Sequence, residues 1–330
     1  MEYTTLGDTG MTVSRICLGC MSFGSSDWRD WTLDEKNSLP IIDRAIDLGI
    51  NFFDTANTYS YGESERVLGN ALEGYDRDEM IVATKVYNAA SPDPHPNETG
   101  LSRKTIDQEL EQSLDRLGME TIDLYQTHRW DYHTPIEETL RALDDVVRRN
   151  KARYIGASSM WAYQFADALH TSDRLNLERF VTMQNHYNLA YREEEREMLS
   201  FCEREGIGVI PWSPLARGYL ARPHEEFLKT TRGEYMNDTS FSERIDTYRA
   251  NGGETINERV EEISDEKGVT MAQISIAWLL HKETVDAPII GTTSIEHLED
   301  AVEALDISLS DSDIDYLEEP YAPVEINGHE

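Results

Sequence analysis

The chain is poor in cysteine and in long apolar runs, and each shortage excludes a class of protein. Its three cysteines, Cys17, Cys20 and Cys202, are too few and too odd in number for a disulfide framework. No run of about 18 apolar residues occurs, so we expect no membrane-spanning helix. The N-terminus has neither the basic region nor the apolar core of a secretory signal, and we therefore expect a cytoplasmic protein.

Positive charge is also scarce. Lys and Arg number 30 against 63 Asp and Glu, which gives a net charge of −33. An acidic surface repels phosphate backbones and anionic lipids, so we expect neither a nucleic-acid nor a membrane partner. Dispersed carboxylates with arginine in excess over lysine are typical of salt-accumulating halophiles, and they predict such a source. Disorder is the other explanation of high charge, but the regular apolar runs argue against it.

Three further features favour structural roles. Cys17 and Cys20 have the spacing of a zinc knuckle, but no second pair and no nearby histidine completes a site. Their apolar neighbourhood indicates buried packing instead. The acidic run 193–195 predicts a solvated helix face, and His186 is predicted to be a loop histidine rather than a ligand.

Short apolar runs alternate with amphipathic runs along most of the chain. The runs expected to form strands are residues 15–21, 50–54, 81–85, 122–128, 152–158, 180–184, 207–212 and 287–291. Those expected to form helices are residues 40–48, 63–72, 102–117, 135–149, 161–169, 192–205, 255–267, 271–281 and 295–305. This alternation predicts an α/β protein with a (β/α)8 TIM barrel, and we expect residues 1–330 to form one barrel domain. A doubly wound sheet would need a Gly-x-Gly-x-x-Gly turn after its first strand, which is missing.

Three segments lie outside this alternation. The first eleven residues predict a hairpin that precedes the barrel, with its turn at residues 7–10. The long connections 86–100 and 213–254 both follow strands. We therefore expect these long loops on the C-terminal face of the barrel, where active sites of this fold are built.

Four polar residues occur where a barrel would bring them together. Asp54, Lys85 and His128 end three of the expected strands, and Tyr59 follows Asp54 by five residues. A buried lysine is costly unless it is paired. An ammonium favours ionisation of a neighbouring phenol, a carboxylate keeps the ammonium charged, and a histidine can hold a carbonyl oxygen. Taken singly, Asp54 could be a helix cap and Tyr59 a packed tyrosine, but the four together predict a proton-transfer site.

Several separated motifs resemble those of the aldo-keto reductase family. They are Asn51-Phe52-Phe53-Asp54-Thr55-Ala56 with Tyr59, Gly62-Glu63-Ser64-Glu65, Thr84-Lys85-Val86, Leu124-Tyr125-Gln126-Thr127-His128, Ile155-Gly156-Ala157-Ser158-Ser159, Pro211-Trp212-Ser213-Pro214-Leu215-Ala216-Arg217-Gly218 and Ile289-Ile290-Gly291-Thr292-Thr293. The resemblance covers almost the whole chain in order. Within the family, His128-Arg129-Trp130-Asp131 is most similar to a bacterial branch associated with formation of 1-deoxyxylulose 5-phosphate.

The resemblance implies an NAD(P)H-dependent oxidoreductase that reduces an aldehyde or ketone to an alcohol, or catalyses the reverse. Tyr59 would be the general acid/base, Lys85 the cation beside it, Asp54 the counterion of the lysine and His128 the group that orients the carbonyl. The positions that match cofactor contacts are Ser158, Ser159, Gln184, Trp212, Ser213, Leu215, Arg217, Gly218, Gly291, Thr292, Ser294, His297 and Asp300. NADPH is the expected cofactor. NADH stays an alternative, because Gly291 and His297 stand where many NADPH-selective relatives carry a fixed cation.

Other functions and several substrates stay open. The resemblance extends to cofactor-holding subunits of potassium channels, so a sensor or regulatory subunit with little turnover is the alternative to an enzyme. A metal-dependent barrel hydrolase would need a His-x-His pair at an early strand end, which the sequence lacks. Trp212 could also be plain core. Arg129 would suit a small anionic substrate, and an apolar pocket for aldehydes could be lined by the tryptophans Trp28, Trp31, Trp130 and Trp161.

Overall fold

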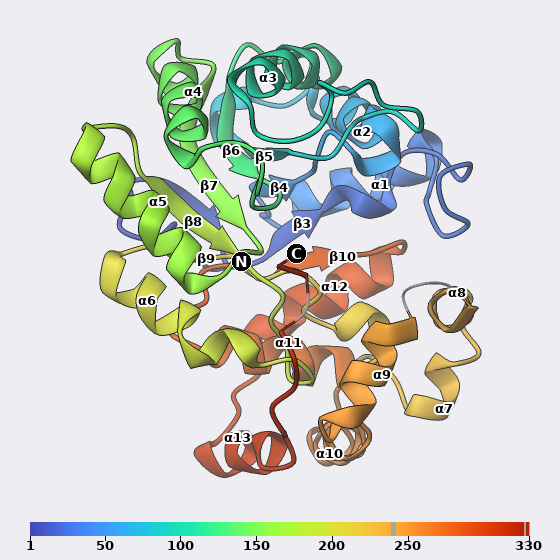
Figure 1. Cartoon of the computed structure of the whole chain (residues 1–330). Coiled ribbons are helices and arrows are strands. Elements are labelled where there is room, and N and C mark those ends of the chain that lie inside the picture. The colour runs from blue at the N-terminus through green and yellow to red at the C-terminus, as the bar shows by residue number, and fades with distance from the viewer. Residues whose placement is uncertain (239–241, 327, 330) are drawn as a thin grey trace.

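A closed parallel sheet lies at the centre of the protein. The computed structural model describes residues 1–238, 242–326, 328 and 329 (Figure 1). Eight parallel strands are hydrogen-bonded in the order β10-β3-β4-β5-β6-β7-β8-β9. The two outer strands meet at a seam, where the Asp286 N–H donates to the Val209 carbonyl and the Ile289 N–H to the Pro211 carbonyl, both at 2.9 Å. This closure makes the sheet a (β/α)8 barrel and confirms the predicted fold.

The helices follow the strands in the alternation that the sequence predicts. The strands are β3 (Cys17–Gly19), β4 (Phe52–Asp54), β5 (Ile81–Val86), β6 (Ile122–Thr127), β7 (Ala152–Ser158), β8 (Phe180–Gln184), β9 (Gly208–Val209) and β10 (Ile289–Gly291). The helices of the alternation are α1 (Glu35–Asp47), α2 (Glu63–Leu72), α3 (Arg103–Leu117), α4 (Ile136–Arg148), α5 (Ala162–Leu175), α6 (Met198–Glu205), α10 (Gly253–Lys267), α11 (Met271–His281) and α12 (Ile295–Glu303). The predicted bounds of α2, β7, β8 and α11 match to the residue.

The predicted N-terminal hairpin is confirmed and closes one end of the barrel. Strands β1 (Tyr3–Thr5) and β2 (Thr12–Ser14) pair antiparallel. Leu6, Met11 and Val13 from the hairpin share a buried cluster with the barrel residues Phe52 and Leu124. The N-terminal end of the barrel interior is therefore filled with apolar side chains, and the polar site must lie at the other end.

The predicted helix over residues 192–205 is wrong in its first half. A 3₁₀ turn (Glu193–Arg196) precedes α6, and Glu197 interrupts the helix with φ −145°. The acidic run is not a solvated face either, since Glu193 and Glu194 are 2% and 3% exposed. Their carboxylates turn inward because the C-terminal tail offers partners: the Tyr321 hydroxyl donates to Glu193 at 2.7 Å, and His329 pairs with Glu194 at 3.2 Å.

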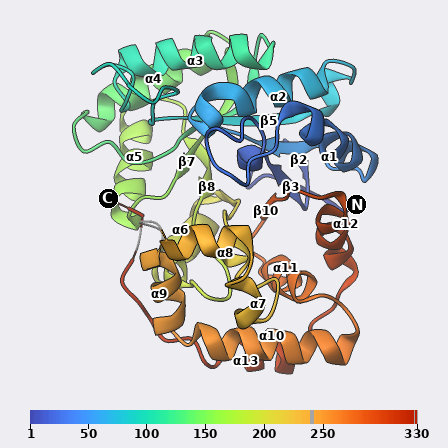
Figure 2. The same ribbon diagram turned by 90° about the vertical axis from the view of Figure 1, so that its right-hand side faces the viewer.

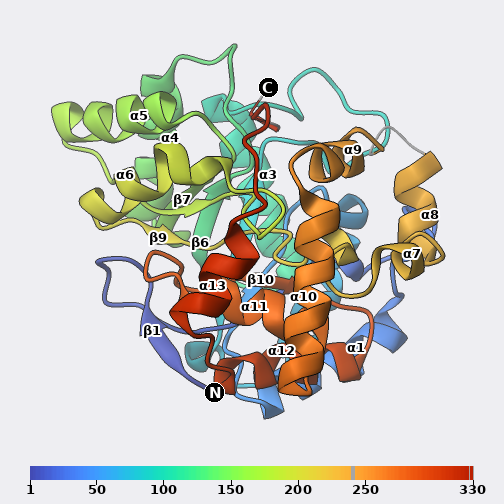
Figure 3. The ribbon, with the colours of Figure 1, turned by 90° about the horizontal axis from the view of Figure 1, so that it is seen from below.

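The long connection after β9 contains helices that the sequence reading missed. It forms α7 (His224–Phe227), α8 (Thr231–Asp238) and α9 (Ser242–Ala250), which lie together beside the barrel (Figure 2). A further unpredicted helix, α13 (Asp311–Glu318), packs along α10. From α13 the tail runs back across the molecule toward the C-terminus (Figure 3). Among the described residues, no helix combines the length and the apolar character of a transmembrane span.

Candidate active site

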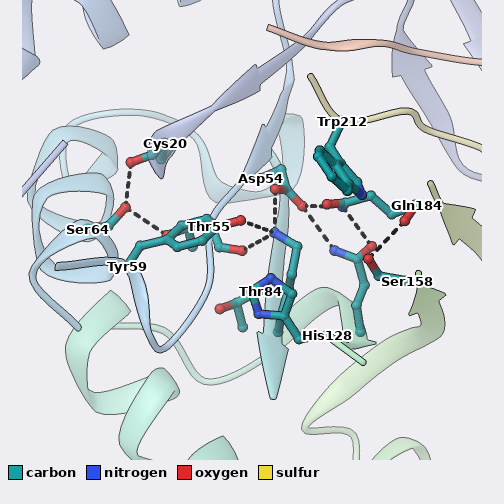
Figure 4. Close-up of polar contacts among 12 residues, drawn as sticks. Cys20, Asp54, Thr55, Tyr59, Ser64, Thr84, His128, Ser158, Gln184 and Trp212 are labelled. Carbon is teal, nitrogen blue, oxygen red and sulfur yellow. Dashed lines mark hydrogen bonds and ion pairs between the residues drawn. The ribbon is translucent and has the colours of Figure 1, made fainter. Parts of the chain in front are cut away.

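The strand ends bring polar side chains together at the open end of the barrel (Figure 4). Asp54 is the last residue of β4, Lys85 lies near the end of β5, and His128 follows β6 directly. Side chains of a strand alternate between its two faces, and the residues two positions earlier on β4 and β5, Phe52 and Ala83, belong to the barrel interior. The same period therefore points Asp54 and Lys85 into the barrel, beyond the apolar layer.

Lys85 uses its ammonium to join three parts of the site. Its Nζ donates to Asp54 Oδ2 at 2.5 Å, to the Thr55 carbonyl at 2.7 Å and to the Tyr59 hydroxyl at 3.3 Å. The lysine is fully buried and Asp54 is 2% exposed. The buried charge thus has a matched counterion, which satisfies the condition for placing lysine in a core. The predicted association of these three residues is present in the structure.

The surroundings favour the protonated form of Lys85 and the neutral form of His128. Burial by itself lowers the pKa of Lys85, but the Asp54 carboxylate and Tyr59 beside it raise that pKa above its ordinary value. Burial lowers the pKa of His128 well below its ordinary value, and the Arg129 and Lys85 charges act in the same direction. His128 is therefore a neutral imidazole near neutral pH, able to donate one N–H to an acceptor.

Tyr59 is presented by a strained turn. Ser60 and Tyr61, which follow it, have φ of 49° and 53°, a region that costs energy for residues other than glycine. The preceding segment is anchored by Asn57, whose Nδ2 donates to Glu109 Oε2 and to the Asn88 carbonyl, both at 2.7 Å. These bonds fix the segment that precedes Tyr59 and so help to hold the phenol at the ammonium.

The rings of Tyr59 and His128 complete the arrangement. They meet edge to face with 5.8 Å between centroids. Tyr59 is only partly buried, so its hydroxyl stands between the buried ammonium and the mouth of the barrel. A carbonyl oxygen placed between the two rings could accept a proton from the phenol and a hydrogen bond from the imidazole.

The amides and hydroxyls predicted for a carboxamide lie next to this cluster. Ser158 Oγ donates to the Gln184 carbonyl at 2.8 Å, and Gln184 Nε2 donates to Asp54 Oδ1 at 2.8 Å. Ser159 has φ 50° and accepts a bond from the Trp212 indole N–H at 3.1 Å. Ser158, Ser159 and Gln184 are buried and form one polar wall, and the half-buried Trp212 lies against it.

Trp212 is part of a stack rather than of the apolar core. Its ring lies 4.2 Å from His186 at an interplanar angle of 8°, and the other face of His186 stacks on Tyr191, also at 4.2 Å. His186 Nε2 bonds the Tyr248 hydroxyl at 2.8 Å. His186 lies in the loop after β8, as expected, but it is 4% exposed and supports the tryptophan, a role that the sequence did not indicate.

The two loops predicted for the phosphates and the adenosine follow the short strands β9 and β10. In the first, Ser213, Ala216, Arg217 and Gly218 all have positive φ, between 47° and 103°. Two N–H groups close this turn internally: Ala216 N–H donates to the Ser213 carbonyl at 2.9 Å and Gly218 N–H to the Leu215 carbonyl at 2.8 Å. Leu215 lies within the same turn, at φ −98°.

In the second loop, Ser294 caps α12 by accepting the His297 N–H at 3.2 Å, and Thr292 Oγ1 donates to the Ser294 carbonyl at 2.8 Å. Gly291 and His297 are exposed. Burial raises the pKa of Asp300, and the neighbouring acidic residues add to the effect. The positions expected for an adenosine therefore lie around the start of one helix, and only Thr292 among them is buried.

The aromatic residues proposed for a substrate pocket divide into two groups. The Trp28 ring lies 6.5 Å from the Tyr59 ring. Trp31 packs edge-on against Trp28, with 6.2 Å between the ring centroids. Trp130 instead packs on the main core, and Trp161 packs on His329 of the tail at 5.0 Å. Arg129 donates to the carbonyl of its neighbour His128 at 2.6 Å, which turns its guanidinium toward its own backbone.

Two residues of the site, Gln126 and His186, were not predicted from the sequence. Gln126 Nε2 donates to Asp54 Oδ1 at 3.0 Å, and Gln126 is fully buried. It precedes His128 by two positions, so the strand period alone would have pointed it into the barrel. His186 follows Gln184 by two positions, which is the same signal, but its stacking partners come from distant segments.

Comparison with known proteins gives a consistent result. The profile of the Aldo/keto reductase family matches residues 15–322. The chain is 42% identical to versiconal hemiacetal acetate reductase of Aspergillus parasiticus, over 99% of both chains. It is 41% identical to aldo-keto reductase AMT2 of Alternaria alternata, over 99% of this chain and 93% of the relative. It is 42% identical, over 99% and 97% of the two chains, to a Schizosaccharomyces pombe protein whose name proposes an aryl-alcohol dehydrogenase.

These three relatives are fungal, and none has a name connected with 1-deoxyxylulose 5-phosphate. The comparisons therefore give no support to the expected bacterial branch or to a halophilic source. The extent of the match does establish the family and the class of reaction, carbonyl reduction or alcohol oxidation. The chain belongs to the aldo-keto reductase family and is an oxidoreductase that acts on carbonyl or CH–OH groups.

Proposed function

We propose that this protein reduces an aldehyde or ketone with NAD(P)H, or catalyses the reverse reaction, and that Tyr59 is its general acid/base. We take residues 1–330 as one catalytic domain. The observation that carries the proposal is the buried Lys85 ammonium, which contacts both Asp54 and the Tyr59 hydroxyl. A lysine held in this way stabilises a phenolate, and so it lets a tyrosine release and recover a proton during turnover.

Each residue then has a separate task in reduction. Tyr59 donates its hydroxyl proton to the carbonyl oxygen of the substrate. Lys85 stabilises the phenolate that results, and Asp54 keeps the lysine protonated and in place. The neutral His128 donates an N–H to the same oxygen and so fixes the direction of the carbonyl. In alcohol oxidation the same groups act in reverse.

The polar wall and the stacked tryptophan fit a nicotinamide dinucleotide. Ser158, Ser159 and Gln184 offer hydroxyl and amide groups of the kind that bind a carboxamide, and Trp212 offers a ring face next to them. The positive-φ turn at residues 213–218 suits a pyrophosphate. A bound reduced nicotinamide would supply the hydride.

The residues that would hold the remainder of the cofactor are Ser213, Leu215, Arg217, Gly218, Gly291, Thr292, Ser294, His297 and Asp300. We propose NADPH as the preferred form, with the 2′-phosphate met by Thr292, Ser294 and His297. His297 is exposed at the start of α12, where a phosphate group could reach it.

For the substrate we propose an aryl aldehyde. The Trp28 ring lies 6.5 Å from the Tyr59 ring at an interplanar angle of 44°, close enough to contact an aromatic group attached to the reacting carbon. The name of the S. pombe relative points to the same class.

An absorbance assay of cofactor oxidation tests the proposal. Wild-type protein is supplied with NADPH or NADH and with a panel of aryl aldehydes, aliphatic aldehydes, ketones and sugar phosphates. We expect turnover to be fastest with an aryl aldehyde and NADPH. Cofactor binding without turnover on any substrate would instead support the sensor or regulatory subunit. Absence of both binding and turnover would refute the proposal.

A further inference from the structure

A second buried glutamine, Gln126, links the proton-transfer residues to the polar wall that we propose for the carboxamide. Gln126 lies on β6, fully buried, between Asp54 and Gln184. Its side-chain amide bonds both the Asp54 carboxylate and Gln184, two residues whose own hydrogen bond is drawn in Figure 4. None of the roles proposed above uses this residue.

Three hydrogen bonds make a closed triangle. Gln126 Nε2 donates to Asp54 Oδ1 at 3.0 Å, and Gln184 Nε2 donates to the same oxygen at 2.8 Å. Gln184 Nε2 also donates to Gln126 Oε1 at 3.1 Å. The other oxygen of Asp54 receives the Lys85 ammonium. One carboxylate therefore serves the lysine with one oxygen and both amides with the other.

The barrel makes room for this triangle by leaving out a side chain. In the strand register Lys85 pairs with Gln126, and Gln126 pairs with Gly156 on β7. A Cβ at Gly156 would lie 2.2 Å from Thr182 Oγ1 and 3.1 Å from Gln126 Cγ. The glycine thus gives the Gln126 amide a path across β7 toward Gln184 on β8.

The triangle also decides which end of the Gln184 amide faces the cofactor side. Both donor contacts of its Nε2 go inward, to Asp54 and Gln126. The amide nitrogen is thereby directed into the barrel, and Oε1 is the end left for a ligand. A carbonyl oxygen accepts hydrogen bonds, so it suits the NH₂ group of a nicotinamide carboxamide.

We propose that Gln126 is a positioning residue that couples the carboxamide subsite to the Asp54–Lys85 pair. It holds the Gln184 amide in its acceptor orientation and supplies one of the two donors on Asp54 Oδ1. This inference rests on the proposed function, because it assigns a role in that same site. Gln126 itself contacts neither the substrate position nor Tyr59.

Two substitutions separate the two halves of this role. Gln126→Met removes both the acceptor for Gln184 and the donor to Asp54. Gln126→Glu keeps an acceptor for Gln184 but replaces the donor by a second carboxylate next to Asp54. Gln108→Met is the matched control, because Gln108 is half-buried on α3, away from the site, and accepts a bond from Lys104 at 3.1 Å.

Cofactor affinity, measured by quenching of tryptophan fluorescence, tests whether Gln126 orients the Gln184 amide. We expect Gln126→Met to raise the Kd of NADPH by about tenfold, the effect of one lost hydrogen bond in a buried site. Gln126→Glu should stay within about threefold of the wild type, because an acceptor for Gln184 remains.

The pH profile of kcat tests whether Gln126, as a donor to Asp54 Oδ1, influences the proton-transfer residues. The charged or titratable groups around the Asp54 carboxylate are Lys85, Tyr59, His128, Cys17 and Cys20. An added negative charge favours the protonated form of each of them, so the ionisation that limits turnover should move to higher pH in Gln126→Glu. A purely structural glutamine would lower the melting temperature and change neither readout.

The Kd of NADPH and the pH profile of kcat are also measured for the wild type and for Gln108→Met, as references. Wild-type Kd and an unshifted profile in both Gln126 variants would overturn the coupling while leaving the proposed function intact. A wild-type protein that binds no nicotinamide cofactor would overturn both. If Gln126→Met does not fold, the near-isosteric Gln126→Glu decides the question alone, through the presence or absence of its profile shift.

Discussion

Two regions at the open end of the barrel are built in different ways. The strand-end site consists of Asp54, Tyr59, Lys85, Gln126, His128 and Gln184. It is built around strands of three to six residues and is held by buried side-chain hydrogen bonds. The loop site, residues 213–218 and 291–300, follows strands of only two and three residues. It is held by backbone turns and a helix cap, and part of it is exposed.

The difference agrees with the roles that we propose for the two regions. A proton-transfer site needs side-chain atoms within a few tenths of an ångström, and well-paired strands provide that rigidity. A pyrophosphate and an adenosine can be bound by backbone N–H groups, which a turn of positive-φ residues can offer. Substitutions in the strand-end site should therefore change chemistry and stability, and substitutions in the loop site should change affinity.

The largest effect is expected for Tyr59→Phe. Removal of the proton donor should lower kcat by about 10² to 10⁴-fold, the usual contribution of general acid catalysis, with little change in the Kd of NADPH. Tyr61→Phe is the matched control, since Tyr61 is 43% exposed in the same turn. Comparable losses of kcat in both variants would argue against the assignment of Tyr59.

Lys85→Met tests the stability of the strand-end site. It leaves Asp54 buried without its counterion, and we expect the free energy of unfolding to fall by about 3 to 5 kcal/mol. Chemical denaturation measures this directly. Lys151→Met is the control. Lys151 pairs with Glu111 at 3.2 Å near the surface, so its substitution should lower the free energy of unfolding by less than about 1 kcal/mol. Equal losses in the two variants would contradict the comparison.

The seam between β9 and β10 gives a pH-dependent prediction. Burial raises the pKa of Asp286 to about 6, against the opposing effects of the Gly7 N–H and Arg15. Because this pKa is higher in the folded than in the unfolded chain, the contribution of the group to stability is complete below about pH 4. It is lost as pH rises through about 6.

Asp286→Asn should remove this dependence. We expect the variant to match the wild type near pH 4 and to exceed its free energy of unfolding by roughly 1 to 3 kcal/mol at neutral pH, with the Asn oxygen still accepting the Gly7 N–H. Denaturation curves across this pH range provide the measurement. A constant difference between the two proteins at every pH would refute the assignment, and Asp93→Asn on an exposed loop serves as the control.

The loop site is tested by Arg217→Ala. Loss of one guanidinium contact should raise the Kd of NADPH by about tenfold and leave kcat at saturating cofactor within about twofold. Arg204→Ala controls for loss of charge, because the Arg204 side chain is 69% exposed on α6. A selective loss of kcat would mean that the loop site shares in the chemistry.

The smallest effect is expected from salt. The net charge of −33 produces self-repulsion that added ions screen, so the melting temperature should rise from low to molar KCl. The rise should be shared by the wild type and the Lys151→Met control. A melting temperature independent of KCl would show that the carboxylates are neutralised within the fold.

The parts of the fold that depend on local pattern were predictable. α3 begins after Ser102, which caps it, and ends at Gly118 with φ 64°, as the residue types at both ends indicate. α13 was not recognised, although Ser310 caps it with a capping box. The helix expected at 192–205 failed for a different reason: Glu193 and Glu194 find partners in the tail more than a hundred residues away, which no local pattern shows.

Sequence alone determined the alternation of strands and helices and the place of Asp54, Tyr59, Lys85 and His128 at the open end of the barrel. The reason is that strand period and strand ends are local properties. Only the tertiary structure decided that Gln126 and Gln184, 72 and 130 residues from Asp54, bond the same carboxylate oxygen. The stack of His186 on Trp212 and the burial of the acidic run likewise depend on barrel closure, because their partners meet only when distant segments pack together.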